Sequence, residues 1–244
     1  MTRIAHCRSF PTCTAPSTPV IDRTESRVLH EEGGFRYVVA TEEFGNDIVR
    51  VLSESFCHEA MGAALRLSAH DLSGLVERFV PECTTNGLSV VAVPLDDPAT
   101  VAGVFISRDF KSPLPAGVPD EFPWFLPIGA ALTTVDEAYE SKRPGLAPGD
   151  AVDLWMVGVP PDGRFGKRGI ASTLFRVSTE LAHRSGFVRC VTECTGAYSQ
   201  AAARKAGFEE RARLAYRDFR FEGRAVFADV VAPHTHVILY EKEF

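Results

Sequence analysis

A glycine-rich, basic turn between a predicted strand and a predicted helix constrains the fold more than any other segment of the sequence. Residues 151–159 are apolar except for Asp153, which is typical of a buried strand. Apolar residues then recur every three or four positions from Ile170 to Leu181, and Gly186 follows where such a helix would end. This basic turn, residues 159–171, therefore joins the C-terminus of a strand to the N-terminus of a helix, as in an α/β domain.

The position of the basic turn favours the binding of a polyanion. The first N–H groups of a helix have no partner within it, and the helix dipole adds partial positive charge there. Glycines allow close approach of the backbone to a ligand, and cationic side chains add fixed charge; the residues are Gly163, Gly166, Gly169, Arg164, Lys167 and Arg168. Neither a P-loop ending nor GxGxxG is present, so the two interpretations are a pyrophosphate site outside those motifs and a plain surface loop.

Length and composition predict one folded domain after an N-terminal tail. The chain has 244 residues, of which 45% are hydrophobic, so it can bury one sizeable core. We expect a tail over residues 1–30 and a domain over residues 31–244. Residues 1–20 contain Arg3 and Arg8, several Ser, Thr and Pro, and no acidic residue. This composition is typical of a disordered tail, our interpretation here, or of an organellar targeting segment.

Charge, hydropathy and cysteine content argue against several classes of protein. A net charge of −6 argues against a nucleic-acid binder. No apolar run approaches the ~20 residues that span a bilayer. The six cysteines form no CxxC pair, so neither a metal site nor a disulfide framework is expected. We expect a cytoplasmic protein, a monomer or weak homodimer, without nucleic-acid or membrane partners.

Periodicity and turn signals along the rest of the chain predict a mixed α/β domain without internal repeats. The pair of strands around Asp96, Asp97 and Pro98 reads as a hairpin. The expected strands are residues 35–40, 88–93, 100–107, 151–159, 187–193, 208–221 and 237–244, and the expected helices are residues 41–56, 70–79, 124–139, 170–185 and 199–206.

Two of these segments together resemble a known family. The strand, the basic turn ending Gly169-Ile170-Ala171, the helix after it and the segment of residues 198–208 look like the GNAT superfamily of acetyl-CoA-dependent N-acetyltransferases. The turn is similar to that family's Q/R-x-x-G-x-G/A pyrophosphate loop. Gly166 stands at the first motif position in place of Gln or Arg, and the loop is slightly longer than usual. By this resemblance, Arg164 supplies the cation.

The C-terminal segments are similar to the arylalkylamine N-acetyltransferases of the insect dopamine N-acetyltransferase type. The segments that carry this resemblance are residues 194–199, 205–208, 216–219, 226–227 and 232–234. Those enzymes also have a phenylalanine-containing helix that ends Asp-Glu-Pro, where this chain has His58-Glu59-Ala60. The resemblance covers residues 35–244 and is densest in the last part of the chain.

The resemblance implies a mixed, mostly antiparallel sheet flanked by helices, and an enzyme. Its reaction would transfer acetyl from acetyl-CoA to a small amine, an arylalkylamine, by direct attack in a ternary complex. Polyamines, amino acids or protein amines are alternative acceptors, and a non-catalytic CoA-binding module is an alternative outside enzymes. No cysteine is placed to hold an acetyl group.

The resemblance also implies the roles of individual residues. Glu59 would be the base, Thr195 and Ser199 the two hydroxyls that assist proton movement and thiolate departure, and Tyr198 a second candidate acid. A solvated Glu59 and a helix-capping Ser199 are the structural alternatives. The expected acetyl-CoA contacts are Met156, Val157, Val159, Arg164, Gly166, Lys167, Arg168, Gly169, Ile170, Ala171, Ser199 and Lys205.

Aromatic and histidine residues complete the candidate site. Phe122, Trp124 and Phe125 could stack on an aryl acceptor or belong to the core. His234 and His236 have no evident third metal ligand, and we expect structural roles for them.

Overall fold

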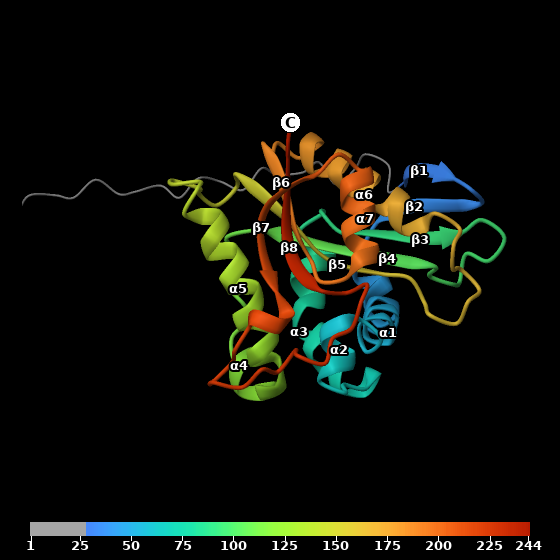
Figure 1. Cartoon of the computed structure of the whole chain (residues 1–244). Helices are drawn as coiled ribbons and strands as arrows, with labels where there is room; N and C mark the ends of the chain where they lie inside the picture. Colours follow the sequence, from blue (N-terminus) through green and yellow to red (C-terminus); the bar gives the residue numbers. More distant parts are fainter. Residues whose placement is uncertain (1–27) are drawn as a thin grey trace, which may run out of the picture.

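An eight-stranded sheet with helices on both faces organises the described part of the chain, residues 28–244 of a computed structural model (Figure 1). The predicted tail lies outside these residues, except that residues 28–30 belong to the first strand. The strands are β1 (Val28–Glu32), β2 (Phe35–Val39), β3 (Val90–Pro94), β4 (Gly103–Asp109), β5 (Ala151–Gly158), β6 (Arg189–Cys194), β7 (Glu209–Ala215) and β8 (His236–Glu243). The helices are α1 (Gly45–Phe56), α2 (Ala60–Ala64), α3 (Ala69–Thr85), α4 (Val118–Glu121), α5 (Leu126–Glu140), α6 (Ile170–Arg184) and α7 (Ala197–Lys205).

The sheet confirms the expected mixed, mostly antiparallel topology. Its order is β1-β2-β3-β4-β5-β6-β8-β7, and among the described strands only β5 and β6 run parallel. The predicted hairpin is present, because β3 and β4 pair antiparallel. The connection from β5 through α6 to β6 is a βαβ crossover, the arrangement that the strand, turn and helix pattern indicates.

Helices cover opposite faces of the sheet and divide its core. Helices α6 and α7 pack on one face, as their position in front of the strands in Figure 1 shows. Helices α1 and α3 cover β4 and β5 on the other face, and α5 covers β7 and β8 there. The second face therefore has two apolar clusters.

Strands β5 and β6 separate after a short paired segment. Their register runs from Ala151 opposite Arg189 to Asp153 opposite Val191, and the described strands have no further register between them. Beyond it β5 stays paired with β4, and β6 with β8. The backbone of β5 after Asp153 consequently has one edge free for another partner.

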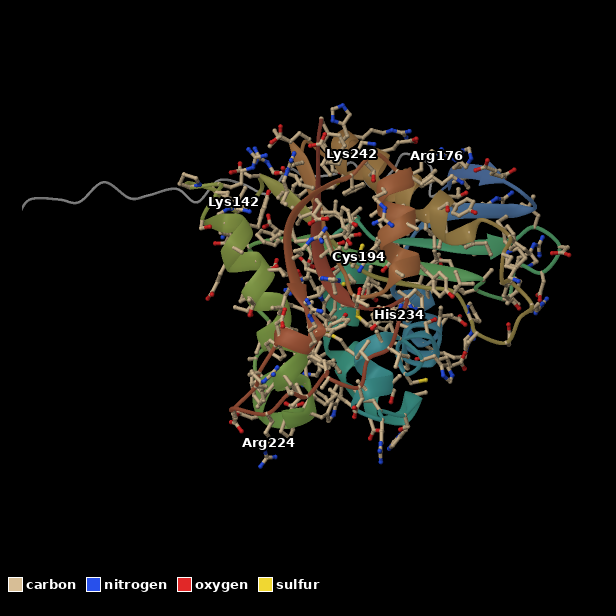
Figure 2. The ribbon with its side chains drawn as sticks, in the orientation of Figure 1. Lys142, Arg176, Cys194, Arg224, His234 and Lys242 are labelled. Atoms are coloured by element: carbon tan, nitrogen blue, oxygen red, sulfur yellow. The ribbon has the colours of Figure 1, made fainter. Side chains whose placement is uncertain are left out.

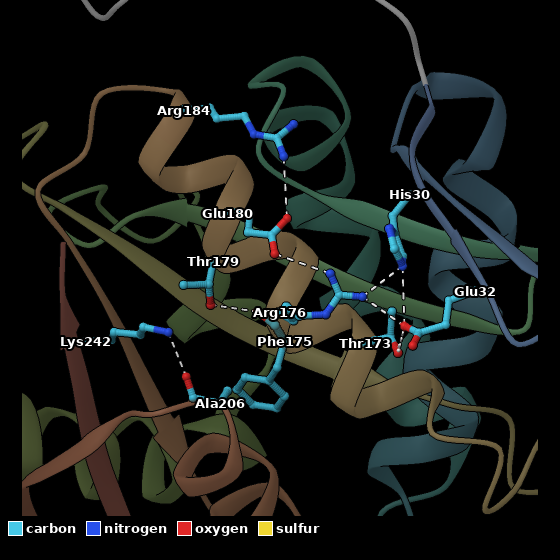
Figure 3. Close-up of polar contacts among 10 residues, drawn as sticks. All are labelled: His30, Glu32, Thr173, Phe175, Arg176, Thr179, Glu180, Arg184, Ala206 and Lys242. Atoms are coloured by element: carbon cyan, nitrogen blue, oxygen red, sulfur yellow. Dashed lines mark hydrogen bonds and ion pairs between the residues drawn. The ribbon is translucent and has the colours of Figure 1, made fainter.

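A polar network attaches helix α6 to the first hairpin, as Figure 3 shows. Arg176 on α6 donates to Glu32 on β1 at 2.8 Å and lies 2.9 Å from a ring nitrogen of His30. Thr173, one turn earlier, also donates to Glu32. At the other end of the face, Lys242 donates to the Ala206 carbonyl at 2.8 Å. The helix after the basic turn is thus attached to the edge strand β1.

Several elements differ from the sequence-based expectation. Helix α1 begins at Gly45 and not at residue 41, α3 extends to Thr85, and the strand expected over residues 208–221 ends at Ala215. Helix α7 begins at Ala197 with Gly196 as its N-cap residue, so the alternative in which Ser199 caps the helix is wrong. The short helix α2 was not predicted, because its five residues are too few to show a period. None of the described helices is long and apolar enough to span a bilayer.

Candidate active site

A cavity of about 120 Å³ opens at the point where β5 and β6 separate. It lies between α3 and α5, and its wall includes residues of α2, β5, β6 and the start of α7. The lining residues are Phe56, Glu59, Met61, Gly62, Leu72, Leu75, Trp124, Phe125, Ile128, Leu132, Leu154, Trp155, Met156, Val157, Phe175, Thr192, Glu193, Cys194, Thr195 and Ser199. One cavity therefore contains three of the predicted catalytic residues, Glu59, Thr195 and Ser199.

Glu59 lies at the start of α2, where it is half-buried and points toward the β6 end. Its Oε2 accepts a hydrogen bond from the Met61 backbone N–H at 3.1 Å, which makes it the N-cap residue of α2. Its Oε1 is buried, has no hydrogen-bond partner among the described residues, and faces Gly196, where an added Cβ would lie 3.0 Å away. The alternative of a solvated Glu59 is therefore not what the structure shows.

The segment after β6 carries the two predicted hydroxyl groups. Ser199 donates to the Gly196 carbonyl at 2.9 Å from the first turn of α7. The Thr195 carbonyl accepts from the Tyr216 hydroxyl at 2.5 Å, which fixes the backbone at this corner. Burial raises the pKa of the Cys194 thiol to about 12, so this neighbouring cysteine stays a neutral thiol.

His234 supports the same corner from the segment before β8. Its Nδ1 accepts from the Ala197 backbone N–H at 3.1 Å. Figure 2 labels His234 and Cys194, which mark the two chain segments that meet here. Tyr198 packs its ring edge-on against His234, is 77% exposed, and is not part of the cavity wall. Of these two hydroxyl residues, Ser199 therefore lines the cavity and Tyr198 does not.

The basic turn adopts a glycine-dependent conformation with its polar residues exposed. Gly163 and Gly169 have φ values of 81° and 80°, a region that favours glycine, and Lys167 adopts φ 59°. Gly169 is the N-cap residue of α6, and Ile170 is buried in the core beneath it. Gly166 and Ala171 complete the turn around these residues. The helix N-terminus thus faces outward, as an anion site requires.

Two of the three cations of the basic turn already have partners. Arg164 forms an ion pair with Asp97 at 3.0 Å in the β3–β4 turn. Arg168 stacks over Phe35 at 4.3 Å and donates to the Gly33 carbonyl at 3.4 Å. Lys167 is exposed. Arg164 has to leave Asp97, or share it, before it can contact a pyrophosphate.

The predicted β5 contacts lie along the free strand edge. Met156 and Val157 line the cavity, and Val159 follows the end of the strand. The Ser55 hydroxyl of α1 donates to the Val159 carbonyl at 3.0 Å, because Gly158 has no side chain to separate α1 from β5. Lys205 is an exposed residue at the end of α7, away from the cavity wall.

Solved structures identify the fold. Arylalkylamine N-acetyltransferase 2 from Aedes aegypti superposes with a TM-score of 0.71 at 21% identity, over 86% of this chain and 98% of that one. The C-terminal condensation domain of Ebony, solved with beta-alanyl-dopamine, gives 0.72 at 14% identity over 86% and 99%. This chain has the GNAT fold. A polyamine N-acetyltransferase from Drosophila melanogaster that forms N-acetylagmatine gives 0.64 at 16% identity over 86% and 100%. No protein-family model and no curated protein sequence matches the chain.

Within this GNAT fold, the structure adds a group that the sequence did not indicate. Asp136 on α5, Asp153 on β5 and Glu193 on β6 form a carboxyl cluster in which Asp153 is buried and the other two are half-buried, and Glu193 lines the cavity. The one signal in the sequence was Asp153, the only polar residue of an otherwise apolar strand. Asp136 and Glu193 come from other elements, and no local pattern connects them.

The described residues hold no group of three or more His, Cys, Asp or Glu side chains arranged to bind a metal ion. Two further buried cysteines, on α3 and β6, are also unsuited to nucleophilic chemistry. Burial raises the pKa of Cys83 and Cys190 to about 12, so both stay protonated.

Proposed function

We propose that this chain transfers the acetyl group of acetyl-CoA to the primary amine of a small molecule, and that the acceptor is an arylalkylamine. The observation that carries the proposal is the cavity at the separation of β5 and β6. It brings Glu59, Thr195 and Ser199 together beside the free edge of β5. The likeness to the N-acetyltransferases of known structure supports the reaction class.

Acetyl-CoA would bind along β5 and the basic turn. The free backbone groups of Met156, Val157 and Val159 suit the amides of a pantetheine arm, which needs hydrogen-bond partners in a strand-like arrangement. The N-terminus of α6, with Lys167 and Arg168 beside it, suits the pyrophosphate. The free edge of β5 and the N-terminus of α6 follow one another in the chain, so one extended acetyl-CoA molecule could contact both.

The chemistry requires a base, because a protonated amine is not a nucleophile. Glu59 would take the proton through its Oε1, the oxygen that faces the cavity corner, while Oε2 stays bound to the backbone of Met61. The amine nitrogen would then attack the thioester carbon, with the carbonyl oxygen stabilised by backbone N–H donors of β5. Direct attack in a ternary complex is the mechanism we propose, and the neutral thiol of Cys194 in the cavity wall is consistent with it.

The departing CoA thiolate requires a proton or a hydrogen bond. Ser199 would supply it, and Thr195 would assist proton movement beside Glu59. Ser199 is proposed first because its residue lines the cavity, whereas Tyr198 is exposed beside His234. The carbon–nitrogen bond forms, the carbon–sulfur bond then breaks, and the proton that the nitrogen still has to lose resupplies the Ser199 hydroxyl, so that the products are CoA and a neutral amide.

Aromatic walls support an aryl acceptor. Phe56, Trp124, Phe125 and Trp155 line the cavity, and stacking on an aromatic ring is favourable in such a site. Solved structures with the same fold carry the names of arylalkylamine and polyamine N-acetyltransferases. Polyamines are the alternative acceptors, and a carboxylate in the wall, Glu193, is the observation that favours them.

Release of free CoA tests the proposal. Purified protein with acetyl-CoA and a panel of tyramine, dopamine, tryptamine and polyamines should release CoA and form the N-acetyl product. Glu59→Gln should lower kcat/KM about 10²- to 10⁴-fold, because the general base is lost. Glu54→Gln, a matched change on α1 outside the cavity wall, should leave the rate unchanged. No turnover with any amine, or equal rates for Glu59→Gln and the unmodified chain, would contradict the proposal.

The basic turn provides a separate test of the co-substrate. The triple change Arg164→Ala, Lys167→Ala and Arg168→Ala should raise KM for acetyl-CoA strongly and leave KM for the amine nearly unchanged, since only the pyrophosphate contacts are lost. Arg184→Ala, an exposed arginine at the other end of α6, is the control. The reverse pattern of KM values would show that acetyl-CoA binds elsewhere.

A further inference from the structure

The cavity continues through the sheet, from the face covered by α1, α3 and α5 to the face covered by α6. Many of its lining residues belong to the two apolar clusters of α1, α3 and α5. Leu154, Phe175 and Cys194 also line it, and these three belong to the apolar cluster beneath α6 and α7. Residues of opposite faces can line one cavity here because β5 and β6 separate after a short paired segment.

The two faces of the cavity suit the two substrates of the proposed reaction. Glu59 and the aromatic side chains of Phe56 and Trp124 line the part on the face of α1, α3 and α5, where the amine would lie. The basic turn leads into α6 on the opposite face, so the CoA thioester would reach the separation of β5 and β6 from the side of α6. The amine therefore approaches the thioester from one face of the sheet, and Phe175 on α6 lies on the other.

The stereochemistry of acyl transfer determines where the acyl chain lies. The thioester carbon is trigonal, and the amine nitrogen has to approach it at a steep angle to the plane of its three substituents. As the carbon becomes tetrahedral, these substituents bend away from the nitrogen. With the oxygen at the backbone of β5 and the sulfur on the pantetheine arm, the third substituent is the acyl chain. It therefore bends toward the face of α6, where Leu154, Phe175 and Cys194 line the cavity.

Phe175 closes this side of the cavity with a ring that is packed on its far side. It is 1% exposed, and of the described residues of α6 it is the one that lines the cavity. Its ring packs edge-on against Phe105 on β4, with the centroids 4.8 Å apart, and against Phe208 after α7 at 6.2 Å. Its side chain and that of Arg176 leave α6 in different directions (Figure 3). Close-packed interiors resist added volume, so the ring has no free space into which an acyl chain could push it.

A hydrogen bond across the separation fixes the width of the cavity at this point. The Thr192 hydroxyl on β6 donates to the Leu154 carbonyl on β5 at 2.8 Å, one residue beyond the last paired positions, Asp153 and Val191. Thr192 and Leu154 are both buried, and both line the cavity. A buried hydrogen bond is costly to break, so the two strands resist moving apart to admit a longer acyl chain.

We propose that Phe175 determines the length of the acyl group that this chain transfers, and that its ring restricts the donor to acetyl-CoA over longer acyl-CoA thioesters. This inference rests on the proposed acetyl transfer and adds the residue that selects the donor. An acetyl group ends in one methyl group, whereas a butyryl group carries two further methylenes that would need the space of the Phe175 ring. One added methylene in an apolar pocket typically changes specificity by about 10- to 200-fold.

The dependence of kcat/KM on donor length tests the role of Phe175. With acetyl-, propionyl- and butyryl-CoA and one amine, the unmodified chain should favour acetyl over butyryl by at least about 10-fold. Phe175→Leu and Phe175→Val remove progressively more of the ring, so they should raise the butyryl to acetyl ratio by about 10-fold or more and leave KM for the amine nearly unchanged. Phe187→Leu, a matched change at a buried residue beyond the other end of α6 and outside the cavity wall, should keep the ratio of the unmodified chain.

Binding without an amine separates this inference from the proposed reaction. In calorimetric titrations, both Phe175 variants should bind CoA as the unmodified chain does, because CoA has no acyl group, and should bind butyryl-CoA more tightly. This pattern without CoA release for any amine would support the acyl site and contradict acetyl transfer. Equal kcat/KM values for acetyl- and butyryl-CoA in the unmodified chain would overturn the inference and leave acetyl transfer standing. So would an unchanged ratio in Phe175→Leu, the milder of the two core changes, when that variant binds CoA normally.

Discussion

Two carboxyl sites lie on the adjacent strands β8 and β6, and their hydrogen-bond partners differ in kind. Glu241 on β8 is 0% exposed, and it accepts hydrogen bonds from the Tyr139 hydroxyl and Arg143 at 2.6 Å and from Arg211 at 2.7 Å. Glu193, on the adjacent strand β6, has an unpartnered oxygen and two carboxyl groups as neighbours. In the sheet register, Glu241 lies opposite Val191, so the two sites are two residues apart along the strands.

The difference in hydrogen-bond partners gives the two sites different protonation states. Burial opposes ionisation of Glu241, but the hydrogen bonds from Arg143, Tyr139 and Arg211 outweigh it and lower its pKa. This group ties α5, β7 and β8 together as a charged anion. The carboxyl cluster instead consists of groups that raise one another's pKa and that burial keeps protonated.

Removing the paired carboxylate should have the largest effect on stability. Glu241→Gln leaves Arg143 and Arg211 without their buried anion, which typically costs 3–5 kcal/mol for a fully buried pair. Both arginines are about a third exposed, so we expect a loss of about 2–3 kcal/mol, or a fall in Tm of about 4–12 °C. Thermal unfolding measures it. Glu243→Gln, which removes a half-exposed partner of the same Arg143, should change Tm little.

The pH dependence of stability should have opposite signs at the two sites. Asp153 titrates near 8 in the folded chain and near 3.8 when unfolded, so the folded state binds the extra proton between these values. Stability is therefore lost as pH rises through this window. Glu241 has a lowered pKa, and its contribution is present at neutral pH and is lost as pH falls through that pKa.

Asp153→Asn should remove the loss of stability that the unmodified chain shows as pH rises. Unfolding by urea should show that, between pH 5 and pH 9, the free energy of unfolding of the variant rises relative to that of the unmodified chain by on the order of 1–3 kcal/mol. Asp150→Asn, in the exposed loop before β5, is the control. Parallel pH curves for Asp153→Asn and the unmodified chain would show that the cluster is ionised and satisfied like Glu241.

The sequence predicted the parts of the site that depend on local order. The strand, basic turn and helix of residues 151–185 follow from hydrophobic period and glycine position alone, and the structure contains them. The resemblance added Glu59, Thr195 and Ser199, which one cavity now contains. These three residues came from the resemblance alone, because no local pattern of the sequence connects them.

The remaining features depend on contacts between distant segments. The ion pair of Arg164 with Asp97 joins two loops far apart in the sequence, so the charge of the basic turn was overestimated. The carboxyl cluster forms only when α5 packs over β5 and β6. No residue spacing within α5 predicts that Asp136 faces inward. Long-range packing of this kind is not encoded in any single window of sequence.

A cation placed beside the carboxyl cluster should stabilise its ionised form, as Arg143 and Arg211 stabilise that of Glu241. Its effect on stability should be the smallest of the three changes considered. Leu132→Lys places an ammonium one turn before Asp136 on the cavity face of α5. A cation within ~4–6 Å lowers carboxyl pKa values, so the loss of stability between pH 5 and pH 9 should become smaller by about 1 kcal/mol. Leu132→Met, which keeps the length without the charge, should keep the slope of the unmodified chain. An unchanged slope would mean that an ammonium at position 132 does not reach Asp136 and Glu193.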